Sequence, residues 1–299
     1  MDSLRSPRLH GRGGIGVPSE RMRFIAGLPR CGTTLLGSIL SQNPAVYLSP
    51  QSDLSHFLHM LEQAETESNQ LGVLRNEQKN LIRGAMDAFY SGMPDRVVID
   101  KSRRWGAPYF LRLLGEVLDQ PARILTPVRP LSEVVASFIR KAQENPETNY
   151  IDKHMIAEDF LPYWRKPLDD ARVDWLLQPN GMLQAGILSV SSAFRDETAH
   201  MFHVYTYTDL VDRPEETVQG IYEFLGLEEF SHDFDLIPNA EPHADVEVLG
   251  IPGFHEVRST LARTSPEPEE VLSDYALTRC EIEDFWTPML KDENRRNHG

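Results

Sequence analysis

The residues best suited to chemistry lie near the N-terminus, in the segment Gly27-Leu28-Pro29-Arg30-Cys31-Gly32-Thr33-Thr34. A short apolar run precedes this segment, and the helical pattern Leu-Leu-Gly-Ser-Ile-Leu follows it. A strand, a Gly/Pro turn and a helix in this order leave the first amides of the helix free to bind a phosphate. The spacing matches the phosphate-binding pattern G-x-x-x-x-G-K-[ST], except that Thr33 occupies the lysine position. We therefore predict a phosphate pocket that lacks the usual cation for a triphosphate.

Two further basic residues follow apolar, strand-like runs. Lys101 comes directly after the run at residues 96–100, and Arg129 comes directly after the run at residues 122–128. Ligands of open α/β sheets collect at the carboxyl ends of the strands. A guanidinium can bind a phosphate through two parallel hydrogen bonds. Arg129 is therefore a candidate phosphate ligand.

Alternating strands and helices are predicted to position these residues. The expected strands are 23–26, 96–100, 122–128 and 203–207, and the expected helices are 33–42, 54–90, 108–118, 131–143, 182–198, 214–225 and 268–286. Residues 46–53 are expected to form a loop and residues 146–179 an irregular segment, and Gly226 is expected to end its helix. The alternation predicts an α/β fold with a P-loop-like central parallel sheet, flanked by helices and carrying helical insertions. We expect one domain over residues 22–290, with a flexible basic tail at 1–21 and a C-terminal tail at 291–299.

The composition narrows the classes of partner. The 299 residues include 30 Lys and Arg against 45 Asp and Glu, which gives a formal net charge of −15. This charge argues against a nucleic-acid partner, and any anionic ligand must be held by local basic groups. The two cysteines, Cys31 and Cys280, cannot form a disulfide framework and fit a cytoplasmic location. We expect no membrane partner, because no apolar stretch has the length of a membrane-spanning helix, and no metal, because the histidines lack metal-ligand spacing.

Three pieces of the sequence together resemble the sulfotransferases that use 3′-phosphoadenosine 5′-phosphosulfate (PAPS). Residues 29–34 resemble their 5′-phosphosulfate loop, which usually has serine at the position of Cys31. Residues 128–137 resemble their 3′-phosphate motif, a strand that ends in arginine with a serine eight positions later, here Ser137. Residues 203–226 resemble their late strand and the helix that ends in Phe-Leu-Gly. The resemblance spans about residues 22–290 and is closest to bacterial members and to the tyrosylprotein branch.

The resemblance implies that a sulfuryl group moves in line from PAPS to a hydroxyl or amine of a small-molecule acceptor, leaving adenosine 3′,5′-bisphosphate (PAP). The residues implied for donor binding are Pro29, Arg30, Cys31, Gly32, Thr33, Thr34, Arg129, Ser137, Tyr207 and Arg258. The loop would bind the 5′-phosphosulfate, and Arg129 and Ser137 would bind the 3′-phosphate. Tyr207 would stack on the adenine or line the acceptor pocket, and Arg258 would be a further phosphate ligand.

The resemblance also places Lys101 beside the oxygen that bridges phosphate and sulfate. Negative charge develops on this oxygen during transfer, so a nearby cation stabilises the transition state. Lys101 and Arg30 are therefore the expected catalytic cations.

The general base is not identified by any motif. Arg103 stands where cytosolic members have histidine, and Gln51 stands where the tyrosylprotein branch has glutamate. Neither side chain can accept the acceptor's proton. Asp53 and His56 lie just beyond Gln51 and are both candidate bases, and Asp100 is a third.

Two other functions remain open. A P-loop small-molecule kinase would explain the loop, although the lysine and a clear Walker B strand are missing. A non-catalytic nucleotide-binding member of the fold would explain the missing base. The sequence predicts neither the identity of the acceptor nor the oligomeric state.

Overall fold

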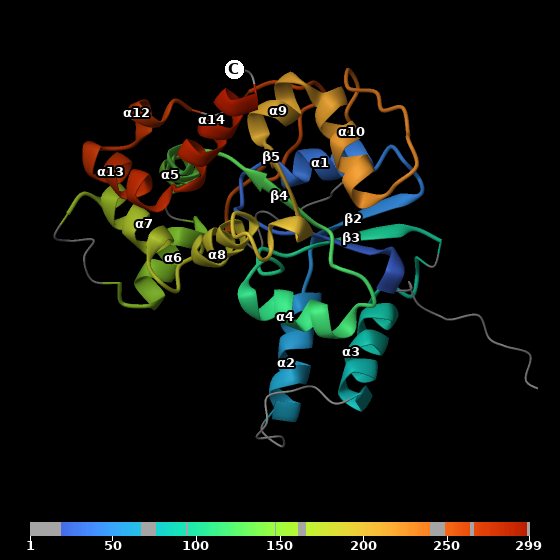
Figure 1. Ribbon diagram of the computed structural model, residues 1–299. Coiled ribbons are helices and arrows are strands. Elements are labelled where there is room, and N and C mark those ends of the chain that lie inside the picture. The colour runs from blue at the N-terminus through green and yellow to red at the C-terminus, as the bar shows by residue number, and fades with distance from the viewer. Residues whose placement is uncertain are drawn as a thin grey trace, which may run out of the picture.

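The computed structural model describes residues 19–66, 76–93, 95–146, 148–160, 166–239, 249–263 and 266–297. Within these residues the centre of the molecule is a five-stranded parallel sheet with the order β2-β3-β1-β4-β5 (Figure 1). The strands are β1 (Met22–Ile25), β2 (Val46–Gln51), β3 (Val97–Lys101), β4 (Ile124–Val128) and β5 (Phe202–Thr206). Because all neighbours are parallel, the five carboxyl ends lie along one edge of the sheet. The predicted P-loop-like parallel sheet is confirmed.

The edge strand β2 corrects a prediction. We expect a loop at residues 46–53 from the sequence, but Val46–Gln51 pair with β3, in a register that shifts between Leu48 and Gln51. Pro50 lies at this irregularity. Proline cannot donate a ladder hydrogen bond and is unfavourable in most strand positions, so Pro50 makes this edge strand hard to recognise in the sequence.

Helices cover both faces of the sheet (Figure 1). One face carries α1 (Thr33–Leu40), α9 (Tyr207–Asp212) and α10 (Pro214–Leu225), and the other carries α2 (Leu54–Thr66), α3 (Asn76–Phe89) and α4 (Pro108–Val117). Neighbouring residues of β1 point to opposite faces, so Ile25 packs with α1 and α10 while Phe24 packs with α2, α3 and α4. Gly226 ends α10 in the left-handed conformation, as predicted.

A third group of helices lies beside the β4 end of the sheet, on the left in Figure 1. Its members are α5 (Leu131–Glu144), α6 (Tyr150–Ala157), α7 (Leu168–Leu177), α8 (Gln184–Ala193), α12 (Pro268–Val271), α13 (Asp274–Glu283) and α14 (Trp286–Asn297). Two short 3-10 turns, η1 (Ser19–Arg21) and η3 (Ala199–Met201), precede β1 and β5.

Three helical expectations are corrected by this group and by its neighbours. Residues 146–179 contain α6 and α7 rather than an irregular segment, and their aromatic rings pack into a core, with Tyr150 and Trp175 at 6.0 Å between centroids. The helix expected at 268–286 is three helices, because Ser273 caps a new one by accepting from the amide of Ala276. Helix α14 also runs past residue 290, where we placed the end of the domain.

Several expectations fall partly outside the described residues. The long helix expected at 54–90 is described as α2 and α3, and residues 67–75 between them lie outside the description. Residues 1–18 of the expected tail also lie outside it, whereas residues 19–21 form η1. None of the helices in the described part of the chain combines the length and the apolar character needed to cross a membrane.

Candidate active site

A cleft of about 700 Å³ lies along the carboxyl ends of the strands. Each strand end contributes to its lining: Asp53 follows β2, Lys101 ends β3, the 27–34 loop follows β1, Arg129 follows β4 and Tyr207 follows β5. The strand order therefore arranges these residues in a row, with the loop in the middle. Ligands of open parallel sheets bind at this kind of edge.

The loop after β1 has the backbone of an anion site. Gly32 precedes α1 with φ of 83°, and no side chain caps the helix. The first helical bond runs from the amide of Leu36 to the carbonyl of Gly32 at 2.9 Å, so the earlier amides have no acceptor within the helix. Thr33 and Thr34 line the cleft at this helix end. The amides and hydroxyls of this turn are suited to a phosphate or a sulfate.

Arg30 connects the loop to two distant segments. Its Nε donates to the hydroxyl of Ser137 on α5 at 3.1 Å, and its Nη1 donates to the carbonyl of Phe254. The guanidinium also lies 4.4 Å from the centre of the Phe254 ring. Arg30 has φ of 65°, in the left-handed region that non-glycine residues rarely occupy. Such backbone strain is concentrated at functional sites.

Arg129 presents an incomplete set of hydrogen bonds. Its side chain is only 6% exposed, Nη1 donates to the carbonyl of Arg30 at 3.1 Å, and Nε donates to Glu133 at 2.7 Å. Its Nη2 is buried and has no hydrogen-bond partner. A buried donor without an acceptor costs about 1–3 kcal/mol. Since Arg129 lines the cleft, this nitrogen is suited to an acceptor that a ligand supplies.

Tyr207 supports both Arg129 and the loop. The Arg129 guanidinium lies 4.6 Å from the centre of its ring. On the other side the ring packs against Gly32, where an added Cβ would come within 2.8 Å of the ring carbon Cδ2. Both the left-handed backbone and this close contact therefore require glycine at position 32.

The end of β3 is held between its two neighbouring strands. The carbonyl of Lys101 accepts from the amide of Ser52 at 2.9 Å, and the amide of Ser102 donates to the carbonyl of Ile25 at 3.1 Å. These bonds place Asp53, the residue after Ser52, next to the β3 end, and both Lys101 and Asp53 line the cleft. His56 is exposed on α2 and is not one of the residues that line the cleft.

The Asp100 side chain does not line the cleft. It lies behind the residues of the strand ends and has a structural role. Its carboxylate is fully buried and accepts from the Ser52 hydroxyl at 2.6 Å, from the Tyr90 hydroxyl at 2.5 Å and from Trp105 Nε1 at 2.6 Å. Burial raises the pKa of Asp100, and these three hydrogen bonds act in the opposite direction. The carboxylate thus connects the β2 end, α3 and the β3 end, and it does not reach an acceptor in the cleft.

The structure places the predicted site residues as follows. Those that line the cleft are Pro29, Arg30, Gly32, Thr33, Thr34, Asp53, Lys101, Arg129, Tyr207 and Arg258. Ser137 lies behind the lining and is bonded to Arg30. The Cys31 side chain is fully buried, and burial raises the pKa of its thiol to about 12. Only the backbone of Cys31 is therefore suited to binding an anion.

Three apolar residues of the cleft are not among the predicted site residues, although Phe254 belongs to the segment at 253–258 that folds over the nucleotide in related sulfotransferases. Phe254 contributes both its carbonyl and its ring to Arg30, and Phe138 and Met182 form part of the lining. Phe138 directly follows Ser137 on α5, which is the one local indication that it lies near the donor. Met182 precedes α8, far from any of the motifs.

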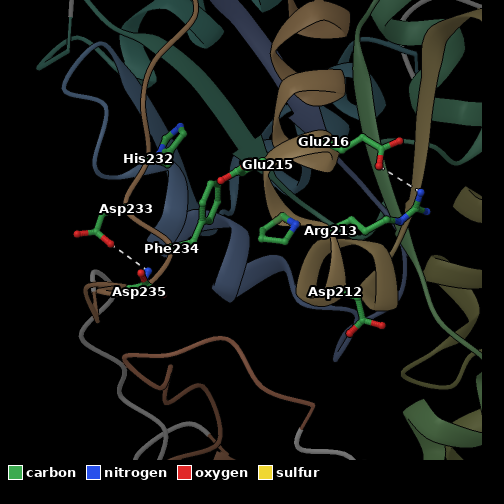
Figure 2. Close-up of a pocket in the computed structure, with 9 residues that line it drawn as sticks. Asp212, Arg213, Glu215, Glu216, His232, Asp233, Phe234 and Asp235 are labelled. Carbon is green, nitrogen blue, oxygen red and sulfur yellow. Dashed lines mark hydrogen bonds and ion pairs between the residues drawn. The ribbon is translucent and has the colours of Figure 1, made fainter.

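A second cavity, of about 630 Å³, lies between the α9–α10 junction and residues 232–235 (Figure 2). Its lining includes Asp212, Arg213, Glu215, Glu216, His232, Asp233, Phe234 and Asp235. Figure 2 shows Arg213 turned toward Glu216, with which it forms an ion pair at 3.2 Å. Carboxylates thus dominate this cavity, and it repels phosphate groups. The cleft at the strand ends is the candidate site for an anionic ligand.

Comparison with known proteins agrees with this geometry. The model of the family described as "Sulfotransferase family" matches residues 24–232, more than half of the chain. The chain belongs to the sulfotransferase family. The matched region begins within β1 and extends past β5, and it therefore includes every strand end of the cleft.

Solved sulfotransferases align with the chain at low sequence identity. A sulfotransferase domain from the curacin biosynthetic pathway aligns with a TM-score of 0.52 and 16% identity, covering 88% of this chain and 96% of that one. The sulfotransferase domain of the Synechococcus PCC 7002 olefin synthase gives 0.46 and 17%, covering 94% and 98%. A mouse sulfotransferase complexed with PAP gives 0.49 and 11%, covering 90% and 85%. A search of curated protein sequences found no significant match.

Proposed function

We propose that this sulfotransferase moves a sulfuryl group from PAPS to a hydroxyl or amine of a small-molecule acceptor by in-line displacement. The observation that carries the proposal is the buried Nη2 of Arg129, which has no hydrogen-bond partner and borders the cleft. A 3′-phosphate is a group that PAPS carries and ATP lacks. A phosphate oxygen would complete the hydrogen bonds of this guanidinium, and family membership also supports PAPS as the donor.

The anion sites of the cleft match the anionic groups of PAPS. Arg129 lies on the β4 side of the loop and is suited to the 3′-phosphate, with Ser137 behind it. The amides and threonine hydroxyls at the start of α1 are suited to the 5′-phosphosulfate. The ring of Tyr207, already in contact with Arg129, is suited to the nucleoside.

When bound, PAPS would supply a sulfuryl group on a mixed anhydride with phosphate. Its transfer breaks the sulfur–oxygen bond to the phosphate and releases PAP, while a sulfur–oxygen or sulfur–nitrogen bond forms to the acceptor, which loses a proton. Lys101 at the β3 end and Arg30 in the loop are the cations suited to stabilise the charge that develops on the bridging oxygen. Asp53, next to the β3 end, is suited to accept the proton. His56 is the weaker candidate because it lies outside the lining.

The proposal also includes the cellular location of the enzyme and the size of its acceptor. We place the enzyme in the cytoplasm, in agreement with Cys31 and Cys280, which are both unpaired and buried. We also propose that the acceptor is a small molecule, because the donor and the acceptor would share one cavity of about 700 Å³.

The test is a turnover assay with PAPS labelled in the sulfuryl group and a panel of small phenols, alcohols and amines. We expect PAP and labelled sulfated product in equal amounts. Binding of PAP without turnover on any acceptor would instead favour a non-catalytic nucleotide-binding member. Phosphorylated product formed with magnesium and ATP would favour a P-loop kinase, and either result would contradict the proposal.

A further inference from the structure

Arg103 is a cation of the cleft that has no part in the proposed donor binding or sulfuryl transfer. It lies two residues past β3 and lines the cleft. Its Nη1 donates to the carbonyl of Met182 at 3.0 Å, and no carboxylate of the described residues forms an ion pair with it. Burial lowers the pKa of Arg103, and Arg104 acts in the same direction while Tyr150 acts in the opposite one. A partly buried cation with only a neutral acceptor is suited to an anionic ligand.

The position of Arg103 is fixed at both ends of the residue. Its carbonyl accepts from the Ser189 hydroxyl on α8 at 2.6 Å, while its guanidinium is bound to Met182. The turn after β3 packs so closely on α8 that a Cβ added at Gly106 would lie 2.9 Å from the Cβ of Ser189. The guanidinium is therefore held in place before any ligand arrives.

Arg103 leaves the sheet at the β3 end, where Lys101 and the neighbouring Asp53 lie. The phosphate-binding elements follow β1, β4 and β5, whereas Asp53 and Arg103 follow β2 and β3. Strand β1 separates β3 from β4, so Arg103 and Arg129 extend from strands that are not neighbours. The turn that carries Arg103 therefore begins beside the proposed base Asp53, and the guanidinium extends from there to Met182, which precedes α8.

We propose that Arg103 binds an anionic group of the acceptor, such as a carboxylate or a phosphate, so that the enzyme sulfates acidic hydroxy or amino compounds in preference to neutral ones. Met182, beside the guanidinium, offers an apolar surface to the remainder of such an acceptor. The inference rests on the proposed function, because it names the substrate class of the same site.

The test uses benzoate and benzamide, which share a ring and differ in charge, with protein saturated with PAP so that the two phosphate sites of the donor are filled. Binding is measured by calorimetry at constant ionic strength. We expect the wild-type complex to bind benzoate about tenfold or more tightly than benzamide. Arg103→Met should abolish this preference and leave the affinity for PAP unchanged. Arg103→Gln, which keeps a hydrogen-bond donor and removes the charge, is a second variant and should give the same result.

Arg104→Met is the matched control, because Arg104 is the exposed neighbour in the same turn and is not part of the cleft lining. It should keep the wild-type preference for benzoate. Equal binding of the two probes by the wild type, or binding of neither, would overturn the inference. The proposed function would still stand in that case, provided that the wild type binds PAP. Loss of PAP affinity in Arg103→Gln would also overturn it, by assigning Arg103 to the donor. Failure of the wild type to bind PAP would refute the proposed function, and this inference with it.

Discussion

Arg30 and Arg129 form a connected pair, and each is placed by the other's segment. Arg129 donates to the carbonyl of Arg30, and Arg30 donates to Ser137 on the helix that follows Arg129. The sequence predicts all three residues as donor ligands, but it does not predict that they bond to one another. Their mutual bonds keep the two cations close together at the middle of the cleft, where a doubly anionic nucleotide would bind.

The candidate base is tested by a pair of substitutions. Asp53→Asn keeps the size of the side chain and removes the proton acceptor, so we expect turnover to fall about 10²- to 10⁴-fold with unchanged PAP affinity. His56→Gln should leave turnover near the wild-type value, because His56 lies outside the lining. The measurement is the steady-state rate of PAP formation with one acceptor. A large loss in His56→Gln and none in Asp53→Asn would reverse the assignment.

The two buried cysteine side chains give a second prediction about single residues. Burial raises the pKa of both Cys31 and Cys280 to about 12, so both thiols are protonated at about pH 8. We expect a thiol reagent to leave the native protein unmodified and to label both cysteines after denaturation. Rapid labelling of native Cys31 would show that the loop opens its side chain to solvent.

Among the elements, the turn between β1 and α1 depends most strongly on a single residue. Gly32→Ala would force a Cβ into the Tyr207 ring at a positive φ. We expect a loss of stability of about 1–3 kcal/mol and a marked loss of PAP affinity. Gly84→Ala is the control, because this glycine of α3 has open space around it. That change should stabilise the helix by up to about 1 kcal/mol and leave PAP binding unchanged, as measured by urea unfolding and calorimetry. Equal effects of the two substitutions would contradict the proposed role of the turn.

The sequence predicts some elements well and others poorly, for physical reasons. The strand ends with Lys101 and Arg129 are predictable because the buried parallel strands before them are mostly apolar, in spite of Asp100 and Pro127. Strand β2 is missed because Pro50 interrupts its pattern, and α6 and α7 are missed because tertiary packing of Tyr150 and Trp175 decides their structure. The contribution of Phe254 to the site is missed because it depends on a contact between residues 224 positions apart.

The net charge of the whole molecule is negative, whereas the lining of the candidate site is mainly basic. The chain carries a formal net charge of −15, yet the described lining of the cleft holds five Lys or Arg side chains against Asp53 and Glu256. The basic residues gather there because the sheet order brings separate strand ends to one edge. Attraction of an anionic donor is therefore a local property of the cleft, and the global charge opposes it.

Two partly buried histidines predict how stability depends on pH. Burial lowers the pKa of His203 and of His232, so the unfolded chain binds more protons just below its ordinary histidine pKa of about 6.5. Stability should therefore be complete above about pH 6.5 and should fall as the pH drops from there toward the folded-state pKa values. His203→Phe keeps the ring stacked on Phe224 and should reduce this loss between about pH 6.5 and 5.5, before most carboxylates titrate. Urea unfolding at both pH values measures it, and an unchanged loss in the variant would contradict the assignment.

The most direct test of the central claim is a calorimetric titration of PAP and of adenosine 5′-phosphate, which lacks the 3′-phosphate, into the wild type and into Arg129→Ala. Charge-assisted hydrogen bonds contribute about 1.5–3 kcal/mol, so we predict a loss of roughly 10- to 150-fold in PAP affinity. The affinity for adenosine 5′-phosphate should stay the same, because Arg129 would have no group to bind. An equal loss for both nucleotides, or no loss for PAP, would contradict the claim that Arg129 recognises the 3′-phosphate of the donor.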